Sequence, residues 1–404
     1  MNLVNIGSEI LVTSLCPSGR QGVDWDNLRK WRVERLRHKM KEYDLDTLMM
    51  VRNENVRYTT DCRYLASMFF VTRFATILTK KNEPVLLVGH ADLANAKRNM
   101  PWIKDIRAIP FAGTEWAKTV EEVLNDYRAG DGKIGLDTPH SVHGYEQLKR
   151  ECSKGTFTDA TEPILSAKAV KSEDEVKIMR EAAAVADIGV QASLEAAKPG
   201  VREFQVGAAG VYAMMMNGAE WYTFAPLCVS GENTARLQRY SSERMIRQGD
   251  LFLVDLGCIY YGYCAEYART KIVGRPNEKQ KEIYRTVYES HMKAIEMIKP
   301  GVNPSDVDRK ARRIIEDAGY GKCQHEHETG HGIGTSLYEL PTIGTHPAAV
   351  ILKEKLFEKN MVVCVEPGIF HPEFGGVRLE DIILVTDTGP EFLSKVEYDD
   401  RLLT

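Results

Sequence analysis

The sequence predicts an α/β protein with two domains, residues 1–167 and 168–404. The chain has 404 residues, whereas a single hydrophobic core stops growing at roughly 250–300 residues. Helix and strand patterns alternate through the first part of the chain, and the second part holds two similar copies of one helix-and-hairpin unit. We therefore expect the second domain to have pseudo-two-fold symmetry.

Composition argues against several classes of partner. The chain is 43% hydrophobic and 27% charged, as in ordinary globular proteins. Its net charge of −4 offers no positive field for nucleic acid or an anionic membrane, so neither partner is expected. The first residues lack a secretory signal pattern, and no apolar run reaches the roughly 18 residues of a membrane span, which predicts a cytoplasmic location. The eight cysteines form no CxxC pair and are expected to be reduced.

The first domain shows helical periodicity over residues 25–43, followed by a strand in "DLDTLMMV". Two further strand patterns, "FATILTK" and "PVLLVG", are separated only by "KNE" and predict a hairpin. Ser172 and Glu175 then form a capping-box pattern that opens a long amphipathic helix. The domain boundary is therefore placed just before this helix.

The second domain contains an internal repeat. "KPGVREFQVGAAGVYAMMMNGA" at 198–219 is echoed by "KPGVNPSDVDRKARRIIEDAGYG" at 299–321. Each helix is followed by a strand, "RMIRQGDLFLVDLG" or "KLFEKNMVVCVEPG". Each strand turns through a Gly-rich segment and returns, as "CIYYGYCAEYARTKIVG" or "IFHPEFGGVRLEDIILVT". We expect one β-hairpin in each copy.

Each predicted hairpin carries two carboxylates, one on either arm: Asp255 and Glu266 in the first copy, Glu366 and Glu380 in the second. Paired antiparallel arms bring such residues to within about 5 Å. If the copies face each other, four carboxylates converge, and buried like charges repel unless cations are present. Two divalent metal ions would remove this repulsion.

A histidine is expected to complete the site. "CQHEHETGHGIG" offers three histidines, and His331 lies between two glycines that allow close approach of the backbone. A set of four carboxylates and one imidazole favours Mn²⁺, Co²⁺ or Fe²⁺, with Zn²⁺ as an alternative and Mg²⁺ less favoured. Any one of these residues alone is more often a solvated strand-end or loop residue. Their joint arrangement on a repeated scaffold indicates a metal site.

These segments resemble the "pita-bread" family, which includes methionine aminopeptidase, Xaa-Pro peptidases and creatinase. The resemblance covers nearly the whole chain and rests on "DLGCIYYGYCAEYART", "GHGIG", "EPGIF" and "GGVRLED". It implies a creatinase-like N-terminal domain, a pita-bread catalytic domain and a homodimer. It also implies two metals held by five ligands, namely Asp255, Glu266, His331, Glu366 and Glu380.

The implied reaction is hydrolysis of a C–N bond in a small carboxylate-bearing substrate or an Xaa-Pro dipeptide. Glu366 would guide the proton from water to the leaving nitrogen, as the resemblance implies. His327, Tyr338 and Gln238 would orient the substrate. Arg378 would support Glu380 or the substrate.

Three positions depart from the peptidase pattern. Glu266 replaces an Asp and is one methylene longer. Gln238 and Tyr338 replace two histidines that contact peptide substrates in the family. Gln does not shuttle protons at neutral pH, and a phenol titrates near 10.

The stretch "NENVRYTTDCRYLASMFFVTRFATILT" is similar in layout to creatinase, where an Arg of one subunit binds the substrate carboxylate in the partner's site. Arg73 falls near that place. The alternative for Arg73 is a surface residue beside an apolar strand.

Other functions stay open at this stage: a lyase, a small-molecule amidohydrolase, or a metal-poor binding protein. Gln238 and Tyr338 favour these alternatives, whereas the retention of all five ligands favours a metalloenzyme. Product analysis separates the lyase from a hydrolase, and elemental analysis separates the binding protein from both.

Overall fold

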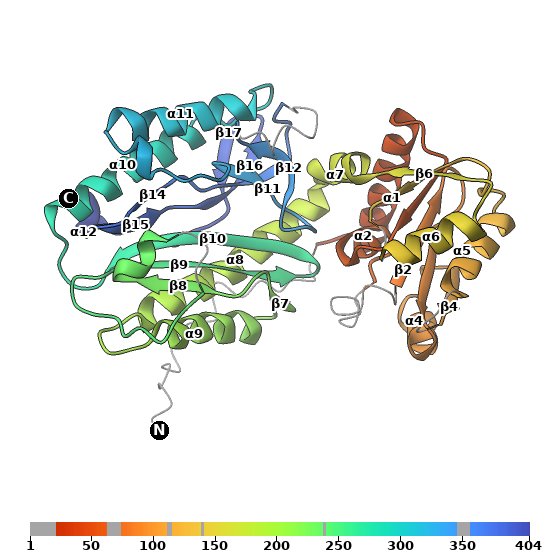
Figure 1. Cartoon of the computed structure of the whole chain (residues 1–404), viewed down its shortest axis with the longest axis horizontal. Helices are drawn as coiled ribbons and strands as arrows, with labels where there is room; N and C mark the ends of the chain where they lie inside the picture. Colours follow the sequence, from red (N-terminus) through yellow and green to blue (C-terminus); the bar gives the residue numbers. More distant parts are fainter. Residues whose placement is uncertain (1–21, 63–73, 111–114, 139–140, 237–239, 346–355) are drawn as a thin grey trace. The chain divides into compact units, whose positions relative to one another are not determined.

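The computed structural model describes residues 22–62, 74–110, 115–138, 141–236, 240–345 and 356–404. They form two compact units, Asp24–Lys168 and Ala169–Thr404, and residues 22 and 23 group with the second. Both units mix helices with strands, which confirms the predicted α/β class (Figure 1).

The first unit is built on a six-stranded mixed sheet in the order β4-β3-β2-β1-β5-β6. The predicted hairpin is present, since β2 and β3 pair antiparallel. The strands are β1 Thr47–Met50, β2 Phe74–Thr79, β3 Val85–Gly89, β4 Asp105–Ile109, β5 Lys133–Leu136 and β6 Thr156–Asp159. The helices are α1 Trp25–Glu42, α2 Asn53–Thr60, η2 His90–Asp92, α4 Leu93–Asn99, α5 Glu115–Asp126, α6 Val142–Glu151 and α7 Thr161–Ala169.

Strand β1 shows why this sheet lies inside the unit. All four of its residues are buried, and successive side chains point to opposite faces. Met49 belongs to a core cluster with residues of α5 and α6. Leu48 and Met50 belong to another cluster with residues of α1 and α7. Helices therefore cover both faces of the sheet.

The second unit contains two larger sheets and a two-stranded ribbon. One sheet joins β7 Trp221–Tyr222, β8 Leu227–Ser230, β9 Leu251–Tyr260 and β10 Tyr263–Ile272. The other has the order β12-β11-β13-β16-β17, with bounds β11 Gly330–Gly332, β12 Glu339–Ile343, β13 Val362–Val365, β16 Asp381–Thr386 and β17 Gly389–Phe392. The ribbon is β14 Gly368–His371 with β15 Gly375–Arg378.

Two pairs of helices enclose these sheets (Figure 1). Helices α8 and α9 lie on the side of β9 and β10, and α10 and α11 lie on the opposite side. The helices are α8 Glu173–Ala196, α9 Glu203–Met216, η3 Gly231–Ala235, α10 Glu278–Ile295, α11 Pro304–Asp317, η4 Gly321–Cys323 and α12 Asp400–Leu403. The predicted capping box of Ser172 and Glu175 is present at the start of α8. Among the described helices, none is long and apolar enough to cross a bilayer.

The two copies of the repeat differ in their return strands. In the first copy β9 and β10 form the expected uninterrupted hairpin. In the second copy the expected hairpin is present but interrupted: β13 pairs with β16, and β14 and β15 pair as a ribbon farther along the same two arms. The extra ribbon brings Arg378 at its end next to Glu380 before β16 begins.

A buried acidic group in α8 makes the stability of the fold depend on pH. Oδ1 of Asp187 accepts hydrogen bonds from the Tyr267 hydroxyl (2.6 Å) and from the Lys395 backbone N–H (2.9 Å). Burial raises the pKa of Asp187 from 3.8 to about 6. Because the folded pKa lies above the unfolded value, ionisation opposes folding, and this contribution to stability is present below pH 4 and lost as the pH rises through 6.

We therefore expect the variant Asp187→Asn to be more stable than the wild type at pH 7.5, by up to about 3 kcal/mol. The amide oxygen can keep both hydrogen bonds, whereas the amide NH₂ replaces Oδ2, a buried oxygen without a partner among the described residues, which offsets part of the gain. Because the wild-type charge is present only where Asp187 is ionised, the stability of Asp187→Asn relative to the wild type should fall as the pH is lowered to 4. Urea unfolding at both pH values measures this, with Asp317→Asn at an exposed position as the control. A pH-independent difference between Asp187→Asn and wild type would contradict the assignment.

Candidate metal centre

The first two predicted ligands come from β9 and β10. Asp255 is paired with Ala268, and Glu266 is paired with Gly257, so the two carboxylates are diagonal neighbours on one face of the hairpin. Both are buried, at 2% and 4% exposure. A Cβ at Gly257 would lie 2.2 Å from the Cβ of Glu266. Glycine at this position therefore lets β9 lie close to β10 beside Glu266.

His331 lies in the short central strand β11, between β12 and β13. A Cβ at Gly330 would lie 2.0 Å from the Cys364 carbonyl oxygen, and one at Gly332 would lie 2.3 Å from that of Leu340. The glycines on both sides of His331 therefore let β11 fit between its neighbours. The Nδ1 atom of His331 lies 3.0 Å from the Gly332 carbonyl oxygen, so Nδ1–H donates there and Nε2 faces the carboxylates.

Glu366 and Glu380 come from the second copy. Glu366 follows the last residue of β13, and Glu380 precedes the first residue of β16. Val365 is paired with Asp381, so the two glutamates lie just beyond this pair on facing chain segments. Backbone contacts hold both: Glu366 N–H donates to the Thr329 carbonyl (2.7 Å), and Glu380 N–H donates to that of Ala268 (3.1 Å). The second contact ties the second copy to β10.

Glu266, Glu366 and Glu380 meet around His331, whereas Asp255 is linked to them through Arg378. The Nε2 atom of His331 lies 3.5 Å from Oε1 of Glu266 and 3.7 Å from Oε1 of Glu366. The guanidinium of Arg378 contacts Asp255 and lies 3.3 Å from Oε2 of Glu366. Arg378 is itself buried, so one cation bridges a carboxylate of each copy.

Glu380 shows that the cluster fits divalent cations. It is 1% exposed, and neither carboxylate oxygen has a hydrogen-bond partner among the described residues. Burial, together with the carboxylate of Glu266, raises the pKa of Glu380 and of Glu366 well above the usual range. Buried carboxylates without partners are costly unless a cation neutralises them. The donor set of carboxylates and one imidazole suits a hard or intermediate divalent metal.

Cys364 is a site residue that the sequence analysis did not single out. Its sulfur and one ligand atom each of Glu266, His331 and Glu380 all lie within 4.8 Å of one another. Cys364 is paired with His331 across β11 and β13, so both side chains lie on the same face of the sheet. The sequence could have indicated Cys364, because it lies two residues before Glu366 on a predicted strand and side chains two apart share one face of a strand. The thiol of Cys364 therefore lies beside the predicted ligands.

The other two histidines of the "HEHETGH" segment have different surroundings. His325 is fully buried, with its ring nitrogens 3.3 Å from the Gly368 carbonyl oxygen and 2.9 Å from Oγ1 of Thr329. It is thus a structural residue. His327 donates from Nδ1 to the Glu328 carbonyl (2.6 Å), and its Nε2 has no partner among the described side chains. Burial lowers the pKa of His327, so its ring is neutral at neutral pH.

Tyr338 lies at the entrance to the cluster. Its side chain is 61% exposed, and its ring centroid lies 4.1 Å from that of His331. The structure therefore brings Tyr338 and His327 to the predicted ligands. Gln238 and Arg73, the other two predicted substrate-binding residues, lie outside the described residues.

Comparison with known families agrees with this geometry. Residues 177–387 match the model of metallopeptidase family M24, and residues 32–170 match the creatinase/prolidase N-terminal domain. The chain belongs to metallopeptidase family M24 and carries a creatinase-type N-terminal domain. It is a metallohydrolase, as predicted.

Individual relatives cover almost the whole chain. The chain is 33% identical to an Xaa-Pro dipeptidase of Pyrococcus horikoshii over 91% of its length and 98% of the relative. Among solved structures, it resembles a prolidase of Pyrococcus horikoshii with a TM-score of 0.78 at 32% identity, covering 91% of this chain and 99% of that one. It also resembles an Xaa-Pro dipeptidase of Bacillus anthracis, with a TM-score of 0.79 at 29% identity, covering 92% and 99%. The predicted pita-bread fold is confirmed.

Proposed function

We propose that this metallohydrolase cleaves the peptide bond of dipeptides with a C-terminal proline, using two divalent metal ions. The observation that carries the proposal is the buried cluster of carboxylates around His331, in which both oxygens of Glu380 lack a partner among the described residues. The names of the relatives support the choice of substrate. Mn²⁺, Co²⁺ and Fe²⁺ suit this donor set best.

Five residues would hold the metals: Asp255, Glu266, His331, Glu366 and Glu380. When bound, such metals lower the pKa of a coordinated water and polarise the carbonyl of the scissile bond. Their charge also reverses the effect of burial, because a neighbouring cation favours the ionised form of a carboxyl group. The pKa values of Glu366 and Glu380 are therefore expected to fall on metal binding.

Glu366 is the proposed proton carrier. Its Oε2 lies 3.3 Å from the Arg378 guanidinium, and its Oε1 lies 3.9 Å from Nδ1 of His327. The carboxylate would take a proton from the attacking water and deliver it to the nitrogen of the leaving proline. The imino nitrogen of proline has no hydrogen in the substrate, so it must gain one when the bond breaks.

His327 and Tyr338 are proposed to orient the substrate. Nε2 of His327 is a free acceptor among the described residues, because Nδ1–H is used by the Glu328 carbonyl. The exposed phenol of Tyr338 can donate to a substrate oxygen above His331. Arg378, by contrast, contacts the carboxylates of Asp255 and Glu366, so we propose that it positions ligands and does not bind substrate directly.

A panel of substrates tests this proposal. Wild-type protein loaded with Mn²⁺ or Co²⁺ is given Xaa-Pro dipeptides, Xaa-Ala dipeptides of the same length, N-acyl amino acids and small guanidino acids. We expect release of free proline from Xaa-Pro dipeptides and little turnover of the others. Turnover confined to acyl or guanidino compounds would assign the site to an amidohydrolase. An unsaturated product without uptake of water would assign it to a lyase.

A further inference from the structure

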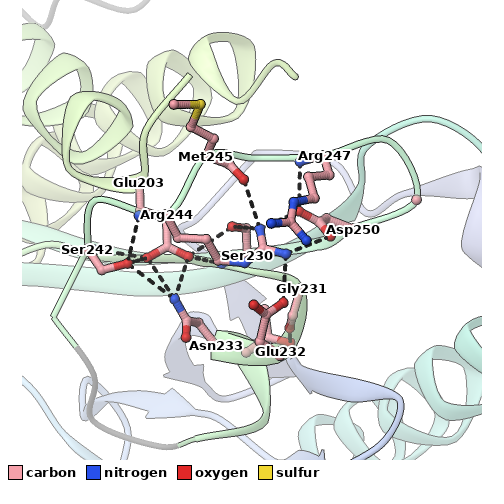
Figure 2. Close-up of polar contacts among 12 residues, drawn as sticks. Glu203, Ser230, Gly231, Glu232, Asn233, Ser242, Arg244, Met245, Arg247 and Asp250 are labelled. Atoms are coloured by element: carbon pink, nitrogen blue, oxygen red, sulfur yellow. Dashed lines mark hydrogen bonds and ion pairs between the residues drawn. The ribbon is translucent and has the colours of Figure 1, made fainter. Parts of the chain in front are cut away.

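Glu203, the first residue of α9, lies at the centre of a buried hydrogen-bond cluster (Figure 2). Its exposure is 0%, and each carboxylate oxygen accepts three hydrogen bonds. Oε1 accepts from the backbone N–H (2.7 Å) and hydroxyl (2.8 Å) of Ser230 and from the Asn233 amide (3.0 Å). Oε2 accepts from the Asn233 amide (3.1 Å) and from the backbone N–H (3.0 Å) and hydroxyl (2.6 Å) of Ser242.

These donors come from both ends of one loop. Ser230 is the last residue of β8, which pairs with β9, so this end is fixed to the sheet. Ser242 lies outside the strands, beside the start of α9. Its carbonyl oxygen accepts a hydrogen bond from the Phe204 N–H (3.2 Å). The carboxylate of Glu203 therefore joins Ser230 to Ser242, and these two residues with Asn233 form the loop base.

Arg244 strengthens the same connection (Figure 2). It donates to the Ser230 hydroxyl (2.7 Å) and to Glu232 (2.7 Å), and it pairs with Asp250 just before β9. The Ser230 hydroxyl thus donates to Glu203 while it accepts from Arg244. The loop is held at its base by a carboxylate and a guanidinium that share one serine.

The held segment supports the metal centre through β15. Oγ1 of Thr234, in η3, accepts a hydrogen bond from the Gly376 N–H (2.7 Å). The contact is close, because a Cβ at Gly376 would lie 2.0 Å from the Thr234 carbonyl oxygen. Gly376 stands two residues before Arg378, which contacts Asp255 and Glu366. A chain of contacts therefore leads from Glu203 through Thr234 to Arg378.

We propose that Glu203 is a positioning residue for catalysis: it fixes the loop base, and through Thr234 it fixes β15 and the Arg378 guanidinium. This inference rests on the proposed function for its effect on turnover. Both oxygens must act as hydrogen-bond acceptors, because each oxygen of Glu203 receives a backbone N–H, from Ser230 or Ser242. An amide NH₂ in either orientation would face one of these N–H groups, and a backbone donor cannot reverse its role as a hydroxyl can.

The test compares Glu203→Gln with Glu243→Gln, an exposed glutamate on the same returning segment. We expect Glu203→Gln to lower kcat for an Xaa-Pro dipeptide by roughly 10- to 100-fold, the range for residues that orient ligands, with a smaller change in KM. In Glu203→Gln the backbone N–H of Gly376 should exchange with solvent faster than in the wild type, by at least the same factor as kcat falls. Both variants should bind as much metal as the wild type, and Glu203→Asp should recover part of the activity.

Thr234→Val provides a second, nearly isosteric variant if Glu203→Gln fails to fold. It removes the acceptor for the Gly376 N–H, which joins η3 to β15, together with the hydrogen bond that the Thr234 hydroxyl donates to the Gly231 carbonyl (2.6 Å) within η3. We expect the same increase in exchange and the same fall in kcat. Wild-type kcat and wild-type exchange at Gly376 in either variant would overturn the inference. If the wild type hydrolyses no Xaa-Pro dipeptide, the proposed function fails, whereas the exchange measurements still decide whether Glu203 holds β15.

Discussion

Replacing Glu366 with glutamine is expected to lower kcat for an Xaa-Pro dipeptide by roughly 10²- to 10⁴-fold at saturating metal, the range for loss of a general acid–base group. Glutamine has nearly the shape of glutamate, and its oxygen can still accept from Arg378, which lies 3.3 Å from Oε2 in the wild type. It cannot carry the proton from water to the proline nitrogen. Steady-state kinetics with added Mn²⁺ or Co²⁺ measures the effect.

The matched control for this variant is Glu373→Gln. Glu373 lies in the exposed turn between β14 and β15, so it is on the same chain segment as Glu366 and away from the cluster. Its kinetics should equal those of the wild type. If Glu366→Gln kept even a tenth of wild-type kcat at saturating metal, another group would carry the proton, and His327 would be the first candidate because its Nε2 is free among the described residues.

Replacing Glu380 with glutamine is expected to abolish metal binding while leaving the metal-free protein at least as stable as the wild type. In the metal-free state Glu380 is a buried carboxyl whose pKa is raised by burial and by Glu266, so its removal relieves repulsion. A metal that binds only the folded state raises the midpoint of thermal unfolding. This increase should be present in the wild type and absent in Glu380→Gln.

Thermal unfolding with and without Mn²⁺, together with metal analysis of the dialysed proteins, tests this expectation. Glu397→Gln, at an exposed position in the same C-terminal region, should behave as the wild type in both. A variant at Glu380 that binds metal normally would exclude this residue as a ligand. A metal-free variant much less stable than the wild type would show that Glu380 has a structural partner in solution.

The repeat explains why the sequence could place the predicted ligands near one another, whereas their binding of metal stays a prediction. Once two hairpins with paired carboxylates are recognised, strand alternation decides which side chains share a face. The register confirms this for the first copy, in which Asp255 and Glu266 are diagonal neighbours. The glycines around His331 were predicted to allow close approach of the backbone, and the contacts at Gly330 and Gly332 confirm this.

Contacts between residues that are far apart in the chain could not be predicted from local sequence patterns. The break that separates the ribbon β14–β15 from β13 and β16 was not predicted, because the returning arm carries no glycine or proline between Arg378 and Asp381 and only Pro367 marks the break on the outgoing arm. The contact of Arg378 with Asp255 joins residues of different copies. Glu203 carries no sequence signal of its role, since the five donor groups that make six hydrogen bonds to it are brought together only by the fold.

Several features stay predictions. Glu266 is one methylene longer than the aspartate usual in the family, and its effect on metal spacing is not yet measured. Gln238 and Arg73 lie outside the described residues, so their contact with substrate stays a prediction from the sequence. The homodimer and the cytoplasmic location also stay predictions.

The cluster around His331 is proposed to be a divalent metal centre on which peptide-bond hydrolysis depends. The most direct test is to remove metal with a chelator and titrate Mn²⁺ or Co²⁺ back into wild type and His331→Ala, following metal bound per chain and proline release together. We predict that wild-type activity disappears and returns in step with metal, up to two ions per chain, and that His331→Ala stays inactive throughout. Full activity in the chelated wild type, or in His331→Ala, would contradict the account.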